Sequence, residues 1–296
     1  MSDIVYRDRG IPEALRAKLE FEYGKDADKI LAAFERERPV TFRVNRLKAD
    51  EGRVLREFAG MTLRRAAFYE DAFILEGASE RDVQKTSLYE EGGIYLQSLS
   101  SMLPPLFVEP KAGESILDMT AAPGGKTTQL SALSGGGALI TACERDKFRF
   151  ERLKYNVEKQ GAGRVTLLNE DARNLSPYFR FDKVLLDAPC SGSGTLSPSN
   201  PVRWSEKLLA KCVLLQRALL KKAFELLKPG GTLVYSTCSV LREENEEAIS
   251  SLKGARLVPL APPEGVPLLP SAEGTLCVRP DGLFEGFFVA KLQKLS

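Results

Sequence analysis

The sequence has no histidine among its 296 residues. This absence excludes hydrolases that rely on a histidine base, and it excludes metal sites built on imidazole ligands. A general base in this chain must therefore be a carboxylate, a lysine, a thiolate or water. The five cysteines include no C-x-x-C pair, which argues against a disulfide framework or a zinc site and favours a reducing cytosol.

Long apolar runs are also missing. No stretch approaches the ~18 apolar residues of a membrane span, and the first ten residues lack the apolar core of a secretory signal. We therefore expect a cytoplasmic protein with no membrane partner and no metal. The net charge of +2 gives no large nonspecific attraction to nucleic acid. The length indicates two domains, and the 43% hydrophobic content is enough for a buried core.

Residues 1–110 are predicted to form a small α+β domain with its connector. A βαβ-type layer on one or two leading helices fits the pattern, with helices at 11–37 and 50–59 and strands at 39–44 and 72–76. Residues 93–108 form an apolar connector, which we expect to be a helix broken at Pro104-Pro105.

Residues 111–296 alternate between strand and helix patterns. Strands are predicted at 115–119, 138–143, 165–168, 183–186, 232–235 and 286–292, and helices at 126–133, 146–160, 205–227 and 243–251. We expect Pro229-Gly230-Gly231 to end the long helix, a polar loop at 188–203, and a Pro/Gly-rich excursion at 259–283. The alternation predicts an α/β fold with a mostly parallel sheet covered on both faces.

Polar residues follow the predicted strands at their carboxyl ends, where ligands bind in such sheets. Asp118 ends the first strand, and a turn of small residues leads to Lys126 at the start of a helix, whose N-terminus favours negative charge. Glu144 ends the second strand and is placed to accept both hydroxyls of a ribose. Glu170 and Asp171 follow the third strand, where they could hold the amino group of an adenine.

Two cysteines lie past the apolar part of later strands. Cys190 follows Asp187, and Cys238 follows Thr237, so both thiols are expected at the ligand end of the sheet. The other three cysteines fit the pattern of small buried hydrophobic residues (Cys143, Cys212 and Cys277).

The turn also invites comparison with a P-loop, because Gly125-Lys126-Thr127 matches the end of G-x-x-x-x-G-K-[ST]. The first glycine of that motif would be residue 120, which is threonine here. A threonine does not readily adopt the glycine conformation that wraps a phosphate, so a P-loop-like NTPase is the weaker alternative.

At these motifs the chain resembles the Sun/RsmB/RsmF family of S-adenosylmethionine-dependent RNA cytosine-5 methyltransferases. The resemblance covers LDMTAAPGGKT (117–127), LLDAPCSGSGT (185–195) and YSTCS (235–239), together with RVN (43–45), IYLQSLSSML (94–103) and GFFVAKL (286–292). It implies a Rossmann-like methyltransferase sheet with an antiparallel last strand. We expect no additional C-terminal RNA-binding module after that strand, and the resemblance leaves the RNA substrate open between rRNA and tRNA.

The resemblance implies roles for individual residues. Cys238 would be the nucleophile, Cys190 would assist release of the product, and Asp187 would hold the base. S-adenosylmethionine would bind with Arg149 nearby, matching a basic position of the family, and its other contacts would come from Thr120, Ala121, Ala122, Pro123, Gly124, Gly125, Lys126, Glu144, Asp171 and Asp187. Enzymes that methylate DNA cytosine use the cysteine of a Pro-Cys pair, here Cys190, so the sequence leaves that exchange of roles open.

The implied chemistry gives its own reason for two thiols. Carbon 5 of cytosine is a poor nucleophile, and a thiolate added to carbon 6 activates it. With no histidine, a second thiol is a credible participant in removing the carbon 5 proton.

The RNA partner is expected to be single-stranded at the target, because the base is out of reach inside a helix. Arg43, Asn45 and Arg46 are candidates for one wall of the RNA groove, with a mere packing role as the alternative. We expect a monomer, and the competing non-enzymatic function is an RNA-binding ribosome-assembly factor on the same fold.

Overall fold

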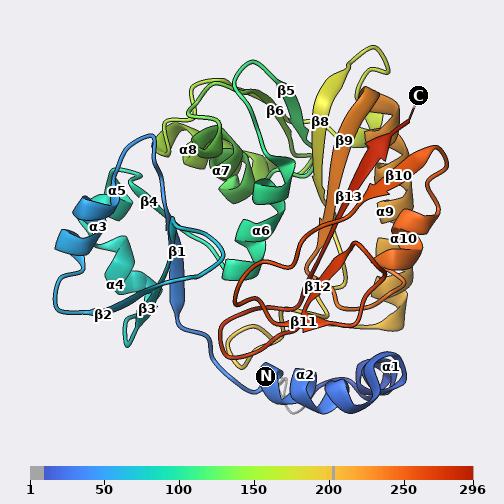
Figure 1. Ribbon diagram of the computed structural model, residues 1–296, viewed down its shortest axis with the longest axis horizontal. Helices are drawn as coiled ribbons and strands as arrows, with labels where there is room; N and C mark the ends of the chain where they lie inside the picture. The colour runs from blue at the N-terminus through green and yellow to red at the C-terminus, as the bar shows by residue number, and fades with distance from the viewer. Residues whose placement is uncertain (1–9, 202–203, 296) are drawn as a thin grey trace, which may run out of the picture.

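The computed structural model describes residues 10–201 and 204–295. The first nine residues and two residues of the expected 188–203 loop therefore lie outside it. Figure 1 shows a small sheet (β1 to β4) beside a larger sheet formed by the later part of the chain. Within the described ranges, no helix combines the length and apolarity needed to cross a bilayer.

The large sheet has the strand order β11-β12-β13-β9-β8-β5-β6-β7, with β10 also paired to β13. The strands from β9 to β7 run parallel, and β13 is antiparallel to β9. This confirms the predicted Rossmann-like sheet and its antiparallel last strand. The strands are β5 (Ser115–Asp118), β6 (Leu139–Cys143), β7 (Val165–Leu168), β8 (Phe181–Asp187), β9 (Leu227–Thr237), β10 (Ala255–Val258), β11 (Leu268–Leu269), β12 (Leu276–Val278) and β13 (Phe287–Lys294).

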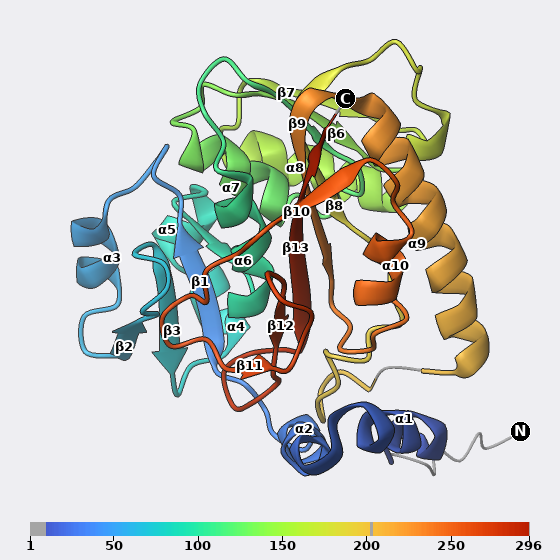
Figure 2. The same cartoon turned by 45° about the vertical axis from the view of Figure 1, so that its right-hand side comes forward.

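Alternate residues of the central strands enter different cores, as expected for a sheet covered on both faces. Leu117 and Val184 pack in one core, whereas Ile116 and Leu185 pack in the other. The two views of the ribbon show the covering helices on opposite sides of this sheet (Figures 1 and 2). They are α6 (Leu99–Val108), α7 (Gly125–Leu133) and α8 (Lys147–Lys159) on one side, and α9 (Glu206–Leu226) and α10 (Glu246–Ser250) on the other.

From β5 the chain first adds β6 and β7 on one side and then β8 and β9 on the other side, so the direction in which strands are added reverses at β5. Such a reversal opens a crevice at the carboxyl ends of the strands, where ligands of doubly wound sheets bind. The loops after β5, β6, β8 and β9 all meet at this edge, and so do the polar residues singled out in the sequence.

The small sheet has the order β2-β3-β1-β4 with antiparallel neighbours, so β1 and β2 are parallel with β3 between them. The expected βαβ layer is therefore present, but β3 lies between its two parallel strands, β1 and β2. The sequence patterns missed the short strands β2 and β4. The elements are β1 (Val40–Val44), α3 (Glu51–Glu57), β2 (Thr62–Arg65), β3 (Ala72–Glu76), α4 (Glu80–Gln84), α5 (Ser87–Glu90) and β4 (Ile94–Leu96).

The leading helices, α1 (Glu13–Tyr23) and α2 (Ala27–Phe34), do not support the small sheet as expected. Leu15, Leu19 and Ile30 are fully buried in a core shared with β5, β8 and α9 of the large domain. Figure 2 shows both helices below the large sheet and away from β1 to β4. The amphipathic pattern predicted the helices correctly, but such a pattern does not specify which apolar surface they cover.

The connector was predicted as a helix broken at Pro104-Pro105, and this was wrong. The segment begins with strand β4, and α6 then runs unbroken through both prolines. A proline removes the hydrogen bond to the carbonyl four residues earlier. For Pro105 that acceptor is the Ser101 carbonyl, which instead accepts a 2.9 Å hydrogen bond from Gln97 Nε2.

The segment Pro229-Gly230-Gly231 does not separate the long helix from the next strand. The helix α9 ends at Leu226, and β9 already begins at Leu227. The strand β13 pairs with β9 only from Thr232 onward, so the side of β9 near Pro229 has no ladder partner in β13. A proline is tolerated at such an edge because no ladder hydrogen bond is required of it.

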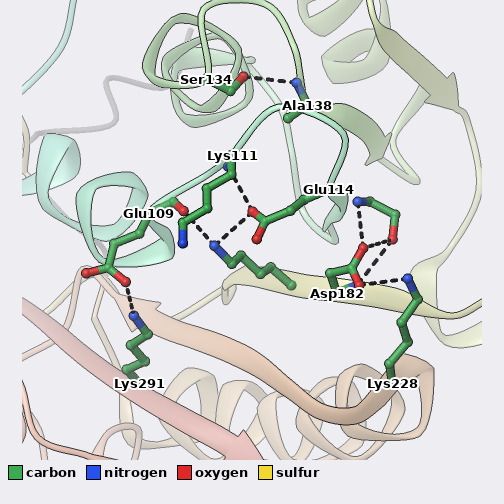
Figure 3. A network of polar contacts seen from close by, with 10 residues as sticks. Glu109, Lys111, Glu114, Ser134, Ala138, Asp182, Lys228 and Lys291 are labelled. Carbon is green, nitrogen blue, oxygen red and sulfur yellow. Dashed lines mark hydrogen bonds and ion pairs between the residues drawn. The ribbon is translucent and has the colours of Figure 1, made fainter.

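A polar network ties the strands together at the edge opposite the crevice (Figure 3). Asp182 accepts hydrogen bonds from Ser115 and pairs with Lys228 at 2.7 Å, which links β5, β8 and β9. Glu109 pairs with Lys291 of β13 at 2.7 Å. Burial alone would raise the pKa of Asp182, but its hydrogen bonds from Lys228 and Ser115 lower it to about 2. The network holds the strands in place without occupying the ligand edge.

Candidate active site

The two cysteines at the strand ends lie in direct contact. Sγ of Cys190 is 3.0 Å from Sγ of Cys238, and both side chains are half-buried. The hydrogen bond with Cys238, together with burial, raises the pKa of the Cys190 thiol well above its usual value. Either sulfur can be the donor in this contact, so the two thiols share one proton-donating position between them.

The loop that carries Cys190 is fixed by the fully buried carboxylate of Glu244. This carboxylate accepts hydrogen bonds from the backbone and the hydroxyl of Ser191, at 2.8 and 2.6 Å, and from Gln216 Nε2 at 3.1 Å. The backbone N–H of Gly194 donates to the Cys238 carbonyl at 3.1 Å, which joins the two cysteine loops directly. A side chain at Gly194 would collide with the Gly286 backbone, because its Cβ would lie 2.2 Å from that carbonyl oxygen.

Asp187, at the end of β8, is held from both sides. Its Oδ2 pairs with Lys126 Nζ at 2.8 Å, and its Oδ1 accepts from Ser236 Oγ at 2.7 Å. Lys126 also donates to Ser101 Oγ at 2.6 Å. The carboxylate is therefore fixed in position on the same loop as Cys190.

The turn after β5 packs closely against its surroundings. Gly124 precedes α7 with φ 106°, a conformation that L side chains rarely adopt, and Gly125 lies against Tyr95 so tightly that a Cβ would come within 2.9 Å of that ring. Arg149 donates to the Ala122 carbonyl at 2.8 Å. Asn156 donates to the Pro123 carbonyl at 2.8 Å. Both donors come from α8, which thus fixes the turn from outside.

Asp118 lies at the start of this turn and is fully buried. Burial raises the pKa of its carboxyl group to about 6, although the 2.7 Å hydrogen bond from Thr127 Oγ1 opposes the shift. Its other oxygen, Oδ1, has no hydrogen-bond partner among the described residues. A buried polar atom without a partner is a candidate contact for a ligand.

One small cavity, of about 80 Å³, lies at the ends of β5 and β6. The Glu144 carboxylate is almost fully buried there, accepts from the Asp146 backbone at 2.9 Å, and lies 3.7 Å from the Arg149 guanidinium. Asp171 lines the same cavity, and its hydrogen bonds from Arg173 lower the pKa of its carboxyl group. The remaining walls of this cavity include two apolar residues of α9 (Leu215 and Leu219).

A second cavity, of about 230 Å³, lies next to the first, and Thr120 lines both cavities. The backbone of the turn forms one wall, and Asp118, Lys126 and Asp187 line it as well. Ten of the sequence-predicted residues line these two neighbouring cavities, namely Thr120, Ala121, Ala122, Pro123, Gly125, Lys126 and Asp187 in the larger and Glu144, Arg149 and Asp171 in the smaller. Gly124, Cys190 and Cys238 are not among the residues that line either cavity.

Two roles were left open for Arg43 and Asn45, a wall of an RNA groove and a packing role, and the structure favours packing for both. Both side chains are buried, at 0% and 1% exposure. Arg43 donates to the Gly125 carbonyl at 2.9 Å and to Thr128 at 2.8 Å, and Asn45 donates to the Gln160 carbonyl at 2.8 Å. Both residues therefore connect the small domain to the large one. Arg46 is exposed and pairs with Asp71.

Arg43→Lys is expected to lower the free energy of unfolding by about 2–4 kcal/mol, because a lysine cannot reach all of the buried acceptors that the guanidinium satisfies. Burial lowers the pKa of Arg43 to about 10, which reflects the cost of enclosing this charge. Urea unfolding measures the difference. The matched control is Arg46→Lys, an exposed position where we expect less than about 1 kcal/mol. Equal effects at the two positions would contradict the assignment.

Sequence reasoning missed two groups of residues in the site. Glu244 and Gln216 gave no signal because a carboxylate and an amide on helical or turn segments look like exposed residues. Tyr95 and Gln97 lie in a motif quoted above, but the pattern alone gave them no role. Among the described residues, no group of three or more cysteine or acidic side chains is placed to hold a metal ion.

Comparison with known families agrees with this geometry. Residues 105–293 match the family described as 16S rRNA methyltransferase RsmB/F, and residues 11–83 match a ferredoxin-like domain of RsmF/B-like methyltransferases. A methyltransferase homolog protein from Pyrococcus horikoshii has a similar structure, with TM-score 0.85, 34% identity, and coverage of 97% of this chain and 96% of that one. NSun6 from the same organism, solved with SFG, has TM-score 0.87 at 24% identity and shares the fold over 96% of this chain and 98% of that one.

Curated relatives carry the name ribosomal RNA small subunit methyltransferase F. The protein from Shewanella loihica is 39% identical over 77% of this chain and 50% of its own length. The protein from Citrobacter koseri is 37% identical over 96% of this chain and 62% of its own length. The chain thus spans between half and two thirds of these relatives. On the family match and the shared fold, the chain belongs to the 16S rRNA methyltransferase RsmB/F family.

Proposed function

We propose that this chain transfers a methyl group from S-adenosylmethionine to carbon 5 of a cytosine in ribosomal RNA through a covalent cysteine adduct. The observation that carries this proposal is the 3.0 Å contact between two cysteines, with Asp187 fixed on the loop of one of them. A methyltransferase that modifies a nitrogen or a hydroxyl group needs no thiol pair, whereas carbon 5 of cytosine needs covalent activation. We also propose that residues 111–296 carry the chemistry and that residues 1–110 support it.

The cofactor is S-adenosylmethionine, and the donor set of the crevice fits it. Glu144 suits the ribose hydroxyls, and Asp171 suits an amino group of the adenine. The tight turn at Gly124 and Gly125 and the start of α7 suit a carboxylate, and the unpartnered oxygen of Asp118 suits an ammonium group. When bound, the cofactor supplies an electrophilic methyl group to carbon 5.

Cys238 performs the first step in this proposal. Its thiolate forms a bond to carbon 6 of the cytosine, and the electron pair of the 5,6 double bond moves to carbon 5. Cys190 stabilises the attacking thiolate by donating its proton in a hydrogen bond. Ring nitrogen 3 takes up a proton from solvent, and the Asp187 carboxylate holds the base by accepting a hydrogen bond from that N–H, which stabilises the adduct.

Cys190 performs the release step. After its own proton has passed to solvent, its thiolate removes the proton from carbon 5. The electron pair re-forms the 5,6 double bond, the bond from carbon 6 to Cys238 breaks, and ring nitrogen 3 gives up its proton. The product is neutral 5-methylcytosine, and one proton is released in total.

Glu144→Ala is expected to weaken binding of S-adenosylmethionine by about 1–3 kcal/mol, because it removes a buried acceptor proposed for the ribose. Calorimetry with the cofactor alone measures this effect without any RNA. Glu151→Ala is the matched control, since Glu151 is an exposed carboxylate on α8 that lines neither cavity. Unchanged affinity in Glu144→Ala would contradict the ribose contact.

The experiment that tests the function uses the purified chain, methyl-labelled cofactor and separate preparations of unmodified 16S rRNA and transfer RNA. The treated RNA is digested to nucleosides and separated. We expect the label in 5-methylcytidine from 16S rRNA. The family name and the names of the relatives support rRNA as the substrate.

Two other outcomes would overturn this proposal. Label in transfer RNA alone would contradict rRNA as the substrate, although it would still support methyl transfer to carbon 5 of cytosine. RNA binding with no transfer would favour the competing function, a ribosome-assembly factor on the same fold. That alternative gives no reason for the close contact of the two thiols or for the fixed position of Asp187.

A further inference from the structure

One face of α8 carries aromatic and cationic side chains in turn. Phe148, Arg152, Tyr155 and Lys159 follow one another at spacings of three or four residues, so they form a single stripe along the helix. Phe148 is 83% exposed and Tyr155 is 61% exposed. Neither ring is buried in a hydrophobic core, and the two charged residues that alternate with them are both cations. We call these four residues the α8 stripe.

The stripe ends at a groove between α8 and the small domain. This groove has a volume of about 210 Å³, and its walls include Tyr89, Tyr95, Asn156 and Lys159. The ammonium group of Lys159 lies 3.6 Å from the centre of the Tyr89 ring and 5.7 Å from that of Tyr155. Lys159 therefore connects an aromatic ring of the small domain to the stripe. Glu80 lines the groove as well.

The groove adjoins the larger of the two cavities at the catalytic site. Tyr95 and Leu96 line both the groove and the larger cavity that contains Lys126 and Asp187. Asn156 donates to the Pro123 carbonyl of the turn at 2.8 Å and to the Tyr95 hydroxyl at 3.4 Å. The wall between groove and crevice is therefore built from the same residues that fix the turn. A chain leaving the crevice over Tyr95 would reach Lys159 and the stripe.

We propose that this groove and the α8 stripe bind single-stranded RNA next to the target cytosine. Bases stack on the exposed rings of Phe148 and Tyr155, and Arg152 and Lys159 contact the phosphates. Interleaved aromatic and cationic side chains are the means by which proteins hold unpaired nucleotides. In a duplex the faces of the bases are covered by neighbouring bases, so they are not available to stack on these rings. The inference rests on the proposed function, whose flipped or unpaired target base requires a single strand beside it.

The test compares binding of fluorescein-labelled single-stranded oligoribonucleotides that tile 16S rRNA, measured by anisotropy at fixed salt. The double variant Phe148→Ala with Tyr155→Ala should weaken binding of the tightest oligonucleotide by about 10-fold or more, because two stacking rings are lost. Lys159→Gln should lower the slope of log affinity against log salt by about one phosphate contact. The control is Tyr178→Ala, whose ring is 90% exposed in the segment before β8, at the sheet edge opposite the crevice.

Binding of S-adenosylmethionine by calorimetry should be unchanged in all of these variants, which shows that they are folded. Equal affinity of the double variant and the wild type would overturn the inference. So would an equal loss for the same oligonucleotides annealed into duplexes, and so would a wild type that binds no single strand. Failure of the proposed function looks different: the wild type would bind RNA and lose affinity in the double variant, yet would produce no 5-methylcytidine.

Discussion

Cys238→Ala is expected to abolish both methylated product and protein–RNA adduct, whereas Cys190→Ala is expected to accumulate an adduct. If Cys238 attacks carbon 6, its loss removes the only bond that activates carbon 5, and the rate should fall by about 10⁴-fold or more. If Cys190 removes the carbon 5 proton, its loss still permits attack and methylation but prevents release. The two thiols are 3.0 Å apart, so only their chemistry distinguishes them.

Denaturing gel electrophoresis of each variant with labelled RNA and cofactor measures this difference. Cys212→Ala is the control, because Cys212 is buried in α9 outside the thiol pair and should behave as the wild type. An adduct in Cys238→Ala and none in Cys190→Ala would reverse the two roles, as in enzymes that methylate DNA cytosine. Full activity in both variants, with no adduct in either, would contradict the proposal that catalysis is covalent.

Asp187→Asn is expected to lower the rate of methyl transfer by about 10²- to 10⁴-fold. An amide cannot hold the proton on ring nitrogen 3 as a carboxylate does, and the substitution also removes the ion pair with Lys126. Single-turnover transfer at saturating cofactor measures the effect. Calorimetry should show cofactor affinity within about 10-fold of the wild type, because the main contacts proposed for the adenosine lie in the other cavity.

Ser236→Ala is the matched control for Asp187→Asn. It removes one 2.7 Å hydrogen bond to the same carboxylate but keeps its charge and its pairing with Lys126. We expect a loss of about 10-fold or less. A rate in Asp187→Asn equal to that in Ser236→Ala would show that Asp187 only braces the loop.

The sequence predicted the large domain well because local pattern and tertiary position coincide there. Buried strands alternate between two cores, as Ile116 and Leu117 do, and polar residues after such strands must share one edge of a parallel sheet. Asp187, Cys190 and Cys238 could therefore be placed together from their positions in the chain. The contact distance between the thiols could not, because it depends on the Glu244 anchor beneath the loop.

The errors concern features that only the folded chain supplies. Pro104 and Pro105 were expected to break α6, but Gln97 satisfies a carbonyl that Pro105 leaves without its helical partner. For Arg43 the sequence left an RNA-facing role and a packing role open, because its buried acceptor, the Gly125 carbonyl, belongs to a turn that is distant in sequence. The leading helices pack in a core of the large sheet and not under the small one, because an amphipathic pattern does not specify which apolar surface a helix covers.

The central claim is tested most directly with RNA that carries 5-fluorocytidine at the modified position. Fluorine at carbon 5 cannot leave as a proton does, so the wild type should stop after methyl transfer with the base still bound to its thiol. The account predicts a complex that survives denaturation, in which the Cys238 peptide carries the methylated fluorinated nucleotide. A nucleotide on Cys190 instead, or no complex from a preparation that methylates ordinary RNA, would contradict it.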